Sequence, residues 1–197
     1  MALHVETPLL KAPPELFGPG RTVWLKMDAL QPSGSFKMRG VGRLVQQRVA
    51  DGARAVVCAS GGNAGMAAAL AALACGVPAT IVVPETTGAP VRAAIAARGA
   101  TVVVHGASWD DANAHASALT AQLGAVYVHP FDDPLLWDGH ATLSTQGLPS
   151  TAAISGVEKD LLAAPPLVMT LERFVPQAIS PVAVFNAAMK RTSTPSQ

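Results

Sequence analysis

A lysine near the start of an expected helix is a candidate for covalent chemistry. Lys37 lies in the segment SGSFKMRG, residues 33–40, which overlaps a Pro-Ser-Gly-Ser turn. In one interpretation Lys37 is an ordinary solvated residue and Ser35 caps the helix. In the other, Lys37 is a nucleophile, because partial desolvation and the positive end of a helix lower the pKa of an amine and favour Schiff-base formation.

A glycine-rich segment between a buried strand and a helix could bind an anion. Residues 60–65, SGGNAG, follow the apolar run of residues 55–59. Backbone N–H groups converge at such a junction, so a carboxylate could sit on these amides, while Asn63 offers a side-chain amide. An ordinary strand-to-helix turn explains the same residues. A dinucleotide site is a weaker alternative, because the order G-x-G-x-x-G is missing.

Strand and helix patterns alternate along the first three quarters of the chain. Apolar runs rich in strand formers predict strands over residues 23–27, 55–59, 79–83, 101–104 and 125–128. Helical spacing and closing glycines predict helices over 36–49, 64–74 and 89–98, and one that Ser108 caps and that ends near 123. This order predicts an α/β fold, a three-layer parallel sheet with helices on both faces.

The composition changes after Leu143. Of the 17 glycines, 15 lie before that residue, and 6 of the 16 prolines fall in the last 54 residues. Strand signals become sparse, and only short helical fragments are expected, over 158–164 and 183–189. Residues 191–197 are expected to form a frayed tail.

Overall composition excludes several classes of function. The chain of 197 residues is 50% hydrophobic and 14% charged, and its net charge of +1 provides no field for nucleic acid or a membrane surface. Residues 55–84 carry no charge, but glycine, proline and weakly inserting alanines argue against a membrane span. Cys58 and Cys75 are the only cysteines, and no signal peptide is evident, so we expect a cytoplasmic protein.

Other polar residues have simpler interpretations. His129, His140 and the nearby aspartates 132, 133 and 138 fit no tight metal-ligand pattern, and the Asp-Asp-Pro sequence is typical of a helix cap, so no metal site is expected. His105 and His115 are expected to be isolated surface or strand-end residues. Arg39 and Lys26 are candidates for structural ion pairs.

Taken together and in this order, the motifs point to a known family. Over residues 5–143 the chain resembles the serine/threonine dehydratase family of pyridoxal-phosphate enzymes of fold type II. The matching segments are TPL (7–9), LKMD (25–28), QPSGSFKMRG (31–40), SGGNAG (60–65), GVPATIVVP (76–84) and PFDDP (130–134). The segment QPSGSFK is especially similar to the L-serine dehydratase branch.

The resemblance implies a role for each candidate residue. Lys37 would be the catalytic residue, holding pyridoxal 5'-phosphate covalently and then taking the substrate Cα proton as general base. Phe36 would flank the cofactor ring, and Asn63 would reach its phenolic oxygen. The substrate carboxylate would be bound by Ser60, Gly61, Gly62 and Asn63. The implied activity is that of an ammonia-lyase in amino-acid metabolism, which converts L-serine, or alternatively L-threonine, by β-elimination; serine gives pyruvate and ammonia.

The resemblance also implies a division of the chain. Residues 1–35 would belong to the larger domain of the fold, residues 36–143 would form the smaller α/β domain, and residues 144–197 would be a divergent, proline-interrupted segment. The larger domain would be mostly missing, which suggests a truncated, spliced or frame-shifted product.

A glycine-rich loop that holds the cofactor phosphate in this family is not found in the sequence. Only Gly147 and Gly156 follow Leu143. Each charge-assisted hydrogen bond to a phosphate contributes about 1.5–3 kcal/mol. Without these bonds the affinity for the cofactor would fall by many powers of ten, so we expect weak or no turnover. The alternative is a catalytically inactive remnant that associates with a full-length homologue, and a homo-oligomer is the other expected assembly.

Overall fold

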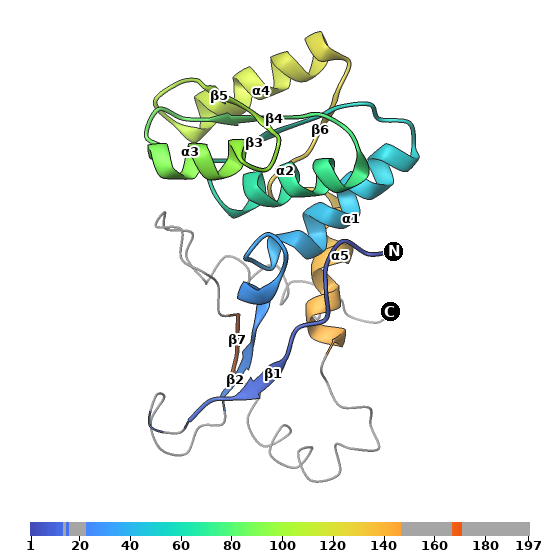
Figure 1. Cartoon of the computed structure of the whole chain (residues 1–197), viewed down its shortest axis with the longest axis vertical. Helices are drawn as coiled ribbons and strands as arrows, with labels where there is room; N and C mark the ends of the chain where they lie inside the picture. The colour runs from blue at the N-terminus through green and yellow to red at the C-terminus, as the bar shows by residue number, and fades with distance from the viewer. Residues whose placement is uncertain (14, 16–22, 147–166, 171–197) are drawn as a thin grey trace, which may run out of the picture.

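A four-stranded parallel sheet forms the centre of the fold (Figure 1). The computed structural model describes residues 1–13, 15, 23–146 and 167–170. The strand order is β5-β4-β3-β6, and each neighbouring pair is parallel. The strands are β3 (Val56–Ala59), β4 (Ala79–Val83), β5 (Thr101–Val104) and β6 (Val126–Tyr127). Every residue of β3 is buried, as expected for a strand in the middle of a covered parallel sheet.

Helices cover both faces of this sheet. The first face carries α1 (Lys37–Ala50), α2 (Asn63–Cys75) and α3 (Ala89–Ala96), and the second carries α4 (Trp109–Leu123). Because α2 consists almost entirely of small apolar residues, it can lie buried between the sheet and α1 with no polar side facing solvent. A smaller core of Val57, Ala59, Val82, Ala112 and Ala116 joins the sheet to α4. The predicted three-layer α/β architecture is confirmed.

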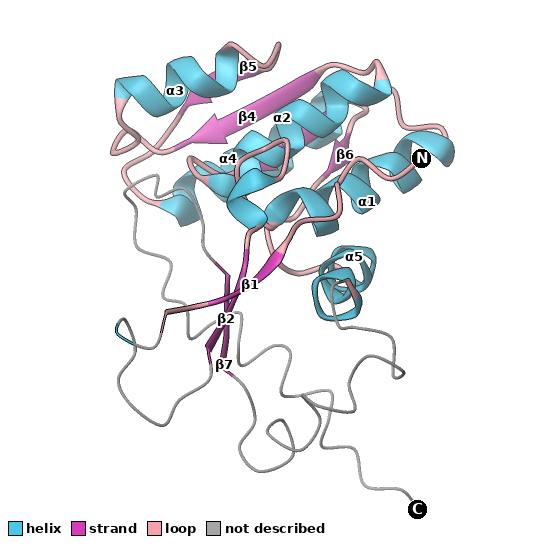
Figure 2. Cartoon of the chain, turned by 60° about the horizontal axis from the view of Figure 1, so that its bottom comes forward, coloured by secondary structure: helices cyan, strands magenta, loops and turns pink. Residues whose placement is uncertain are grey.

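The helix α5 (Pro134–Thr145) packs directly on α1, and Figure 2 looks almost along its axis. Two glycines permit this close approach. A Cβ on Gly40 would lie 2.5 Å from the Leu136 carbonyl oxygen, and a Cβ on Gly139 would lie 2.5 Å from the Arg39 carbonyl oxygen. Both distances are too short for any side chain, so the α1–α5 crossing depends on glycine at both positions.

A second, three-stranded sheet lies apart from the first (Figure 1). It contains β1 (Leu9–Lys11), β2 (Val23–Lys26) and β7 (Leu167–Thr170), with β2 in the middle. Strand β2 pairs antiparallel with β1 and parallel with β7, and a short 3-10 helix, η2 (Asp28–Leu30), follows it. The sequence pattern predicts β2 but neither of its partners.

Most predicted elements agree with the structure. The strands at 79–83 and 101–104 match residue for residue, and Ser108 caps α4 in a full capping box with Asp111. Ser35 does not cap α1, because Phe36 occupies the N-cap position and no side chain makes a capping bond. The helical fragments predicted at 158–164 and 183–189 and the tail at 191–197 lie outside the described residues. Within the described ranges, none of the helices has the length and apolar character needed to span a bilayer.

Candidate active site

The amine of Lys37 lies at the carboxyl end of the central sheet. Gly34, with a φ of +82°, closes the turn that precedes α1, and Lys37 is the first residue of that helix. Its Nζ donates a hydrogen bond of 2.7 Å to the carbonyl oxygen of Pro130, in the segment that follows β6. The same nitrogen lies 5.2 Å from the centre of the Phe36 ring.

The surroundings of this amine hold neutral groups. Burial raises the pKa of the Cys58 thiol to about 12, although the nearby charge of Lys37 acts in the opposite direction. Burial also lowers the pKa of His140 to about 3, with further lowering by the charges of Lys37 and Arg39. Both side chains are therefore uncharged near neutral pH, which gives Lys37 a weakly polar environment on the side of β3 and α5.

Phe36 is held in place from the other helix. Its side chain is buried, and its ring lies 4.8 Å from the ring of His140, with the two planes tilted by 49°. Because His140 comes from α5, the close packing of α5 on α1 fixes the orientation of this phenylalanine. The phenylalanine ring is thereby a fixed apolar surface beside the Lys37 amine.

Residues 60–63 connect β3 to α2. Ser60 N donates to the Val82 carbonyl oxygen at 3.1 Å, which ties the loop to the neighbouring strand β4. Gly62 occupies the N-cap position of α2, and its N–H points to Ser60 Oγ at 3.3 Å, while Asn63 is the first residue of the helix. This loop, defined here as the Ser60–Asn63 loop, presents the amino end of a helix whose first turn bears no acidic residue.

The lysine and the loop both lie at the end of the sheet where the strand order reverses. The chain passes from β3 to β4 and β5 on one side, and then returns to place β6 on the other side of β3. In open α/β sheets a ligand crevice lies outside the carboxyl ends of the strands at such a point. The Ser60–Asn63 loop follows β3, and the Pro130 partner of Lys37 follows β6, so the fold brings the two predicted groups to this position.

An aromatic group at the same edge was not found by sequence reasoning. Trp109 Nε1 donates to the carbonyl oxygen of Ala59 at 2.9 Å, directly before the Ser60–Asn63 loop. Its ring also contacts the rings of His129 and Phe131. The sequence identified Trp109 only as the start of a helix, because its contact with β3 depends on how α4 packs on the sheet.

The remaining candidates have structural roles. Asp133 caps α5 by accepting from Leu135 N at 2.9 Å, as its sequence predicted, and it pairs with Arg48 at 3.0 Å. Among the residues that the structure describes, no three His, Cys, Asp or Glu side chains gather where they could hold a metal ion. His105 and His115 are not isolated as expected, because their rings stack with centres 4.0 Å apart.

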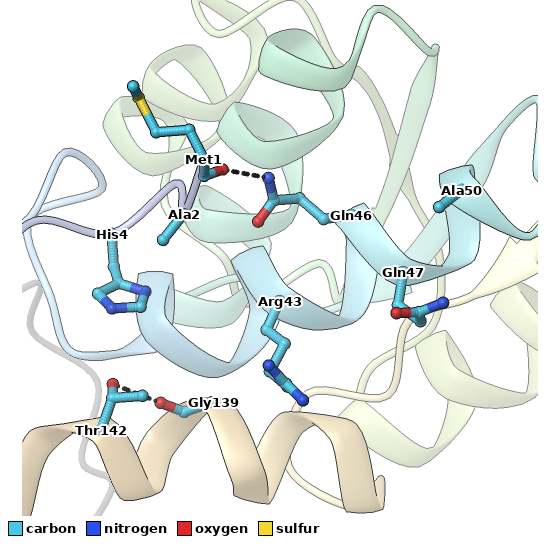
Figure 3. Close-up of a pocket in the computed structure, with 9 residues that line it drawn as sticks. All are labelled: Met1, Ala2, His4, Arg43, Gln46, Gln47, Ala50, Gly139 and Thr142. Atoms are coloured by element: carbon cyan, nitrogen blue, oxygen red, sulfur yellow. Dashed lines mark hydrogen bonds between the residues drawn. The ribbon is translucent and has the colours of Figure 1, made fainter. Parts of the chain in front are cut away.

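A surface groove of about 470 Å³ lies along α1 (Figure 3). Residues from the N-terminus, α1 and α5 line it, and Gln46 Nε2 donates to the Met1 carbonyl oxygen at 2.8 Å. Neither Lys37 nor the Ser60–Asn63 loop contributes to its lining. The groove therefore plays no part in the arrangement described above.

Comparisons with known proteins identify the family of the chain. A family model described as "Pyridoxal-phosphate dependent enzyme" matches residues 2–148. The chain belongs to this family. The L-serine dehydratase/L-threonine deaminase of Mus musculus is 50% identical over 143 residues, which cover 72% of this chain and 44% of the relative.

Solved structures of the family share the fold. A fungal L-serine ammonia-lyase from Rhizomucor miehei has a TM-score of 0.70 and 35% identity over 84% of this chain and 50% of its own. Threonine deaminase isoform 2 from Solanum lycopersicum has a TM-score of 0.66 and 33% identity over 73% of this chain and 40% of its own. The pyridoxal-phosphate family member described here thus spans about half the length, or less, of the proteins it matches.

The residues at the carboxyl edge fit part of a pyridoxal-phosphate molecule. A primary amine suits the aldehyde, the Phe36 ring suits one side of the pyridine ring, and the Ser60–Asn63 loop suits an anionic group. These groups are of the required chemical types: Phe36 and Lys37 begin α1, and the Ser60–Asn63 loop follows β3. The cofactor of this family therefore agrees with the side chains at the edge.

Proposed function

We propose that this chain binds pyridoxal 5'-phosphate at Lys37 and supplies the substrate loop of an L-serine dehydratase, with L-threonine as an alternative substrate. The observation that supports this proposal most is the 2.7 Å hydrogen bond from Lys37 Nζ to Pro130 O. It ties the amine to the segment after β6, the strand that pairs with β3, and the Ser60–Asn63 loop leaves from the end of β3. The names of the relatives support the choice of a small hydroxy amino acid as substrate.

The proposed reaction assigns one task to each residue. When bound, pyridoxal phosphate supplies an electron-withdrawing ring that stabilises negative charge at the substrate Cα. Lys37 Nζ, released from Pro130 O, takes the Cα proton as general base. Phe36 holds one face of the site free of water, and the backbone N–H groups of Gly61 and Gly62 orient the carboxylate, with Ser60 and Asn63 beside them. L-serine thereby loses its Cα proton and its β-hydroxyl group as water, and a second water molecule hydrolyses the released enamine to pyruvate and ammonia.

Binding of the cofactor phosphate limits the proposed activity. Residues 144–197 contain glycine only at positions 147 and 156, so they offer no run of glycine amides for a phosphate group. We therefore propose a low cofactor affinity and slow turnover for this chain alone. The same observation favours a second candidate function, that of an inactive partner of a full-length homologue or of another copy of the chain.

The domain division and location are part of the same proposal. We propose that residues 36–143 form the smaller catalytic domain, with residues 1–35 and 144–197 outside it. Cys58 and Cys75 are free thiols, and Cys58 is completely buried, which supports a reducing compartment such as the cytoplasm.

The proposal is tested with the purified full chain and pyridoxal 5'-phosphate. We expect a visible absorbance band that borohydride reduction traps, with the modified peptide containing Lys37 by mass spectrometry. Lys37→Ala should abolish this band, whereas Lys11→Ala, at an exposed lysine of β1, should leave it unchanged. A trapped adduct on any other lysine, or none at all, would exclude Lys37 as the cofactor residue.

Adding L-serine separates the two candidate functions. Slow pyruvate formation that requires Lys37 supports the dehydratase. A trapped Lys37 adduct without pyruvate, together with measurable association with a full-length homologue, supports the inactive partner instead.

A further inference from the structure

Thr87 is a buried residue for which the proposed reaction has no use. It lies in the connection from β4 to α3, where its N–H donates to the Pro84 carbonyl oxygen at 2.9 Å and closes a turn. The residue is 1% exposed. Its Oγ1 is buried and has no hydrogen-bond partner among the described residues. A hydroxyl buried in this way costs folding free energy, so its presence needs an explanation.

The hydroxyl faces the Ser60–Asn63 loop. A Cβ placed on Gly61 would collide with Thr87 Oγ1 and would lie 3.0 Å from Thr87 Cγ2. The loop therefore packs directly on the polar side of this threonine, and only glycine fits at position 61. The two segments adjoin because β3 and β4 are neighbours, with Ala59 opposite Val82 in the register.

We propose that Thr87 is a further carboxylate-binding residue, whose hydroxyl donates a hydrogen bond to the α-carboxylate of an amino acid held on the amides of Gly61 and Gly62. This inference rests on the proposed function of the loop. A carboxylate oxygen is a strong acceptor, and a donor buried in advance needs little reorganisation when the ligand arrives. Ligand binding then explains why the chain keeps a buried hydroxyl whose lack of a partner costs folding free energy.

The neighbouring residue provides a matched control. Thr86 has the same side chain in the same turn but is exposed, so its hydroxyl can bond to water. Thr87→Val removes the hydroxyl and keeps the shape, whereas Thr87→Ser keeps the hydroxyl and removes a methyl group. Thr86→Val makes the same chemical change at the solvent-facing site.

Two measurements on the full chain test this inference. The first follows the amide resonances of Gly61 and Gly62 in glycine-labelled protein while L-serine is added, which gives a dissociation constant without turnover. The second is thermal unfolding in the absence of an amino acid. We expect Thr87→Val to bind L-serine about tenfold more weakly than the wild type while its melting temperature stays equal or rises. Thr87→Ser and Thr86→Val should keep the wild-type affinity.

The outcomes distinguish this inference from the proposed function. If L-serine moves the Gly61 and Gly62 resonances equally in the wild type and in Thr87→Val, Thr87 is not a ligand-binding residue, and the loop proposal stands. If L-serine leaves both resonances unmoved in the wild type, the loop does not bind the carboxylate and both proposals fail. If Thr87→Val is less stable and also binds more weakly, recovery of affinity in Thr87→Ser supports the inference, and its absence overturns it.

Discussion

Two buried polar regions of this molecule differ in how their atoms are paired. Beneath α1, Asp28 and Arg39 are both 0% exposed and form an ion pair of 2.6 Å. A second bond of 2.8 Å joins Arg39 Nη2 to Asp28 Oδ1, and Thr7 Oγ1 donates to the same oxygen at 2.6 Å. At the carboxyl edge of the sheet, by contrast, the hydroxyl of Thr87 has no described partner. Full pairing in the first region serves the fold, whereas the unpaired hydroxyl in the second needs an explanation, which the proposed carboxylate ligand supplies.

The paired region connects segments that are distant in sequence. Lys26 Nζ donates to the carbonyl oxygens of Thr7 and Gln146, at 2.7 and 2.9 Å. Arg39 Nη1 donates to Gln146 Oε1 at 2.6 Å. These bonds join the N-terminal segment, β2, α1 and the residue after α5. Since Arg39 lies two residues after Lys37, the cluster also fixes the start of the helix that carries the Lys37 amine.

The largest effect is expected from breaking the buried ion pair. Asp28→Ala leaves the Arg39 guanidinium buried without its carboxylate, and losses of this kind amount to about 3–5 kcal/mol of unfolding free energy. Denaturant unfolding monitored by circular dichroism measures this loss. Asp51→Ala, at the exposed end of α1, is the control and should have little effect. A loss below about 1 kcal/mol for Asp28→Ala would contradict a fully paired, water-excluded cluster.

The next largest effect concerns the packing of the loop on Thr87. Gly61→Ala forces a methyl group against the Thr87 side chain, and overpacking of this kind costs about 1–3 kcal/mol. Thr87→Ala removes the two atoms that would lie closest, so the double variant should recover part of the lost stability. A double-mutant cycle in thermal unfolding tests the coupling. Strictly additive effects would show that the loop does not rest on Thr87.

Much of this arrangement could be predicted from the sequence, but not the contacts that complete it. The glycine loop and Lys37 could be placed because local turn and helix signals fix each of them. Thr87 carried no such signal, because its burial against Gly61 arises only when β3 and β4 become neighbours. Strand β7 was missed for a similar reason, since it pairs with β2 across more than 140 residues. His105 and His115 looked isolated because their stacking depends on how α4 packs on the sheet.

A smaller, pH-dependent effect is expected from His140, a buried group at the edge of the site. Burial lowers its pKa to about 3, so the folded chain keeps it neutral where the unfolded chain binds a proton below about pH 6.5. Its neutral form thus stabilises the fold fully above pH 6.5, and this contribution falls as the pH drops toward 3, by at most about 1.4 kcal/mol per unit. Unfolding of wild type and His140→Gln between pH 7 and 4.5 should show a shallower slope for the variant. Parallel slopes would mean that His140 takes up a proton in the folded chain.

The smallest effect is expected at the second ion pair, between Arg48 and Asp133. It tests whether an exposed ion pair stabilises the fold as much as the buried pair of Asp28 and Arg39. Arg48 and Asp133 approach to 3.0 Å, but their side chains are 36% and 15% exposed, so water and salt screen the attraction. Arg48→Ala should therefore cost no more than about 1 kcal/mol of unfolding free energy, and the cost should shrink further in 0.5 M salt. Asp133 keeps its role as the cap of α5 in this variant, so the measurement isolates the ion pair. A loss as large as that of Asp28→Ala would show that burial does not explain the difference in stability between the two ion pairs.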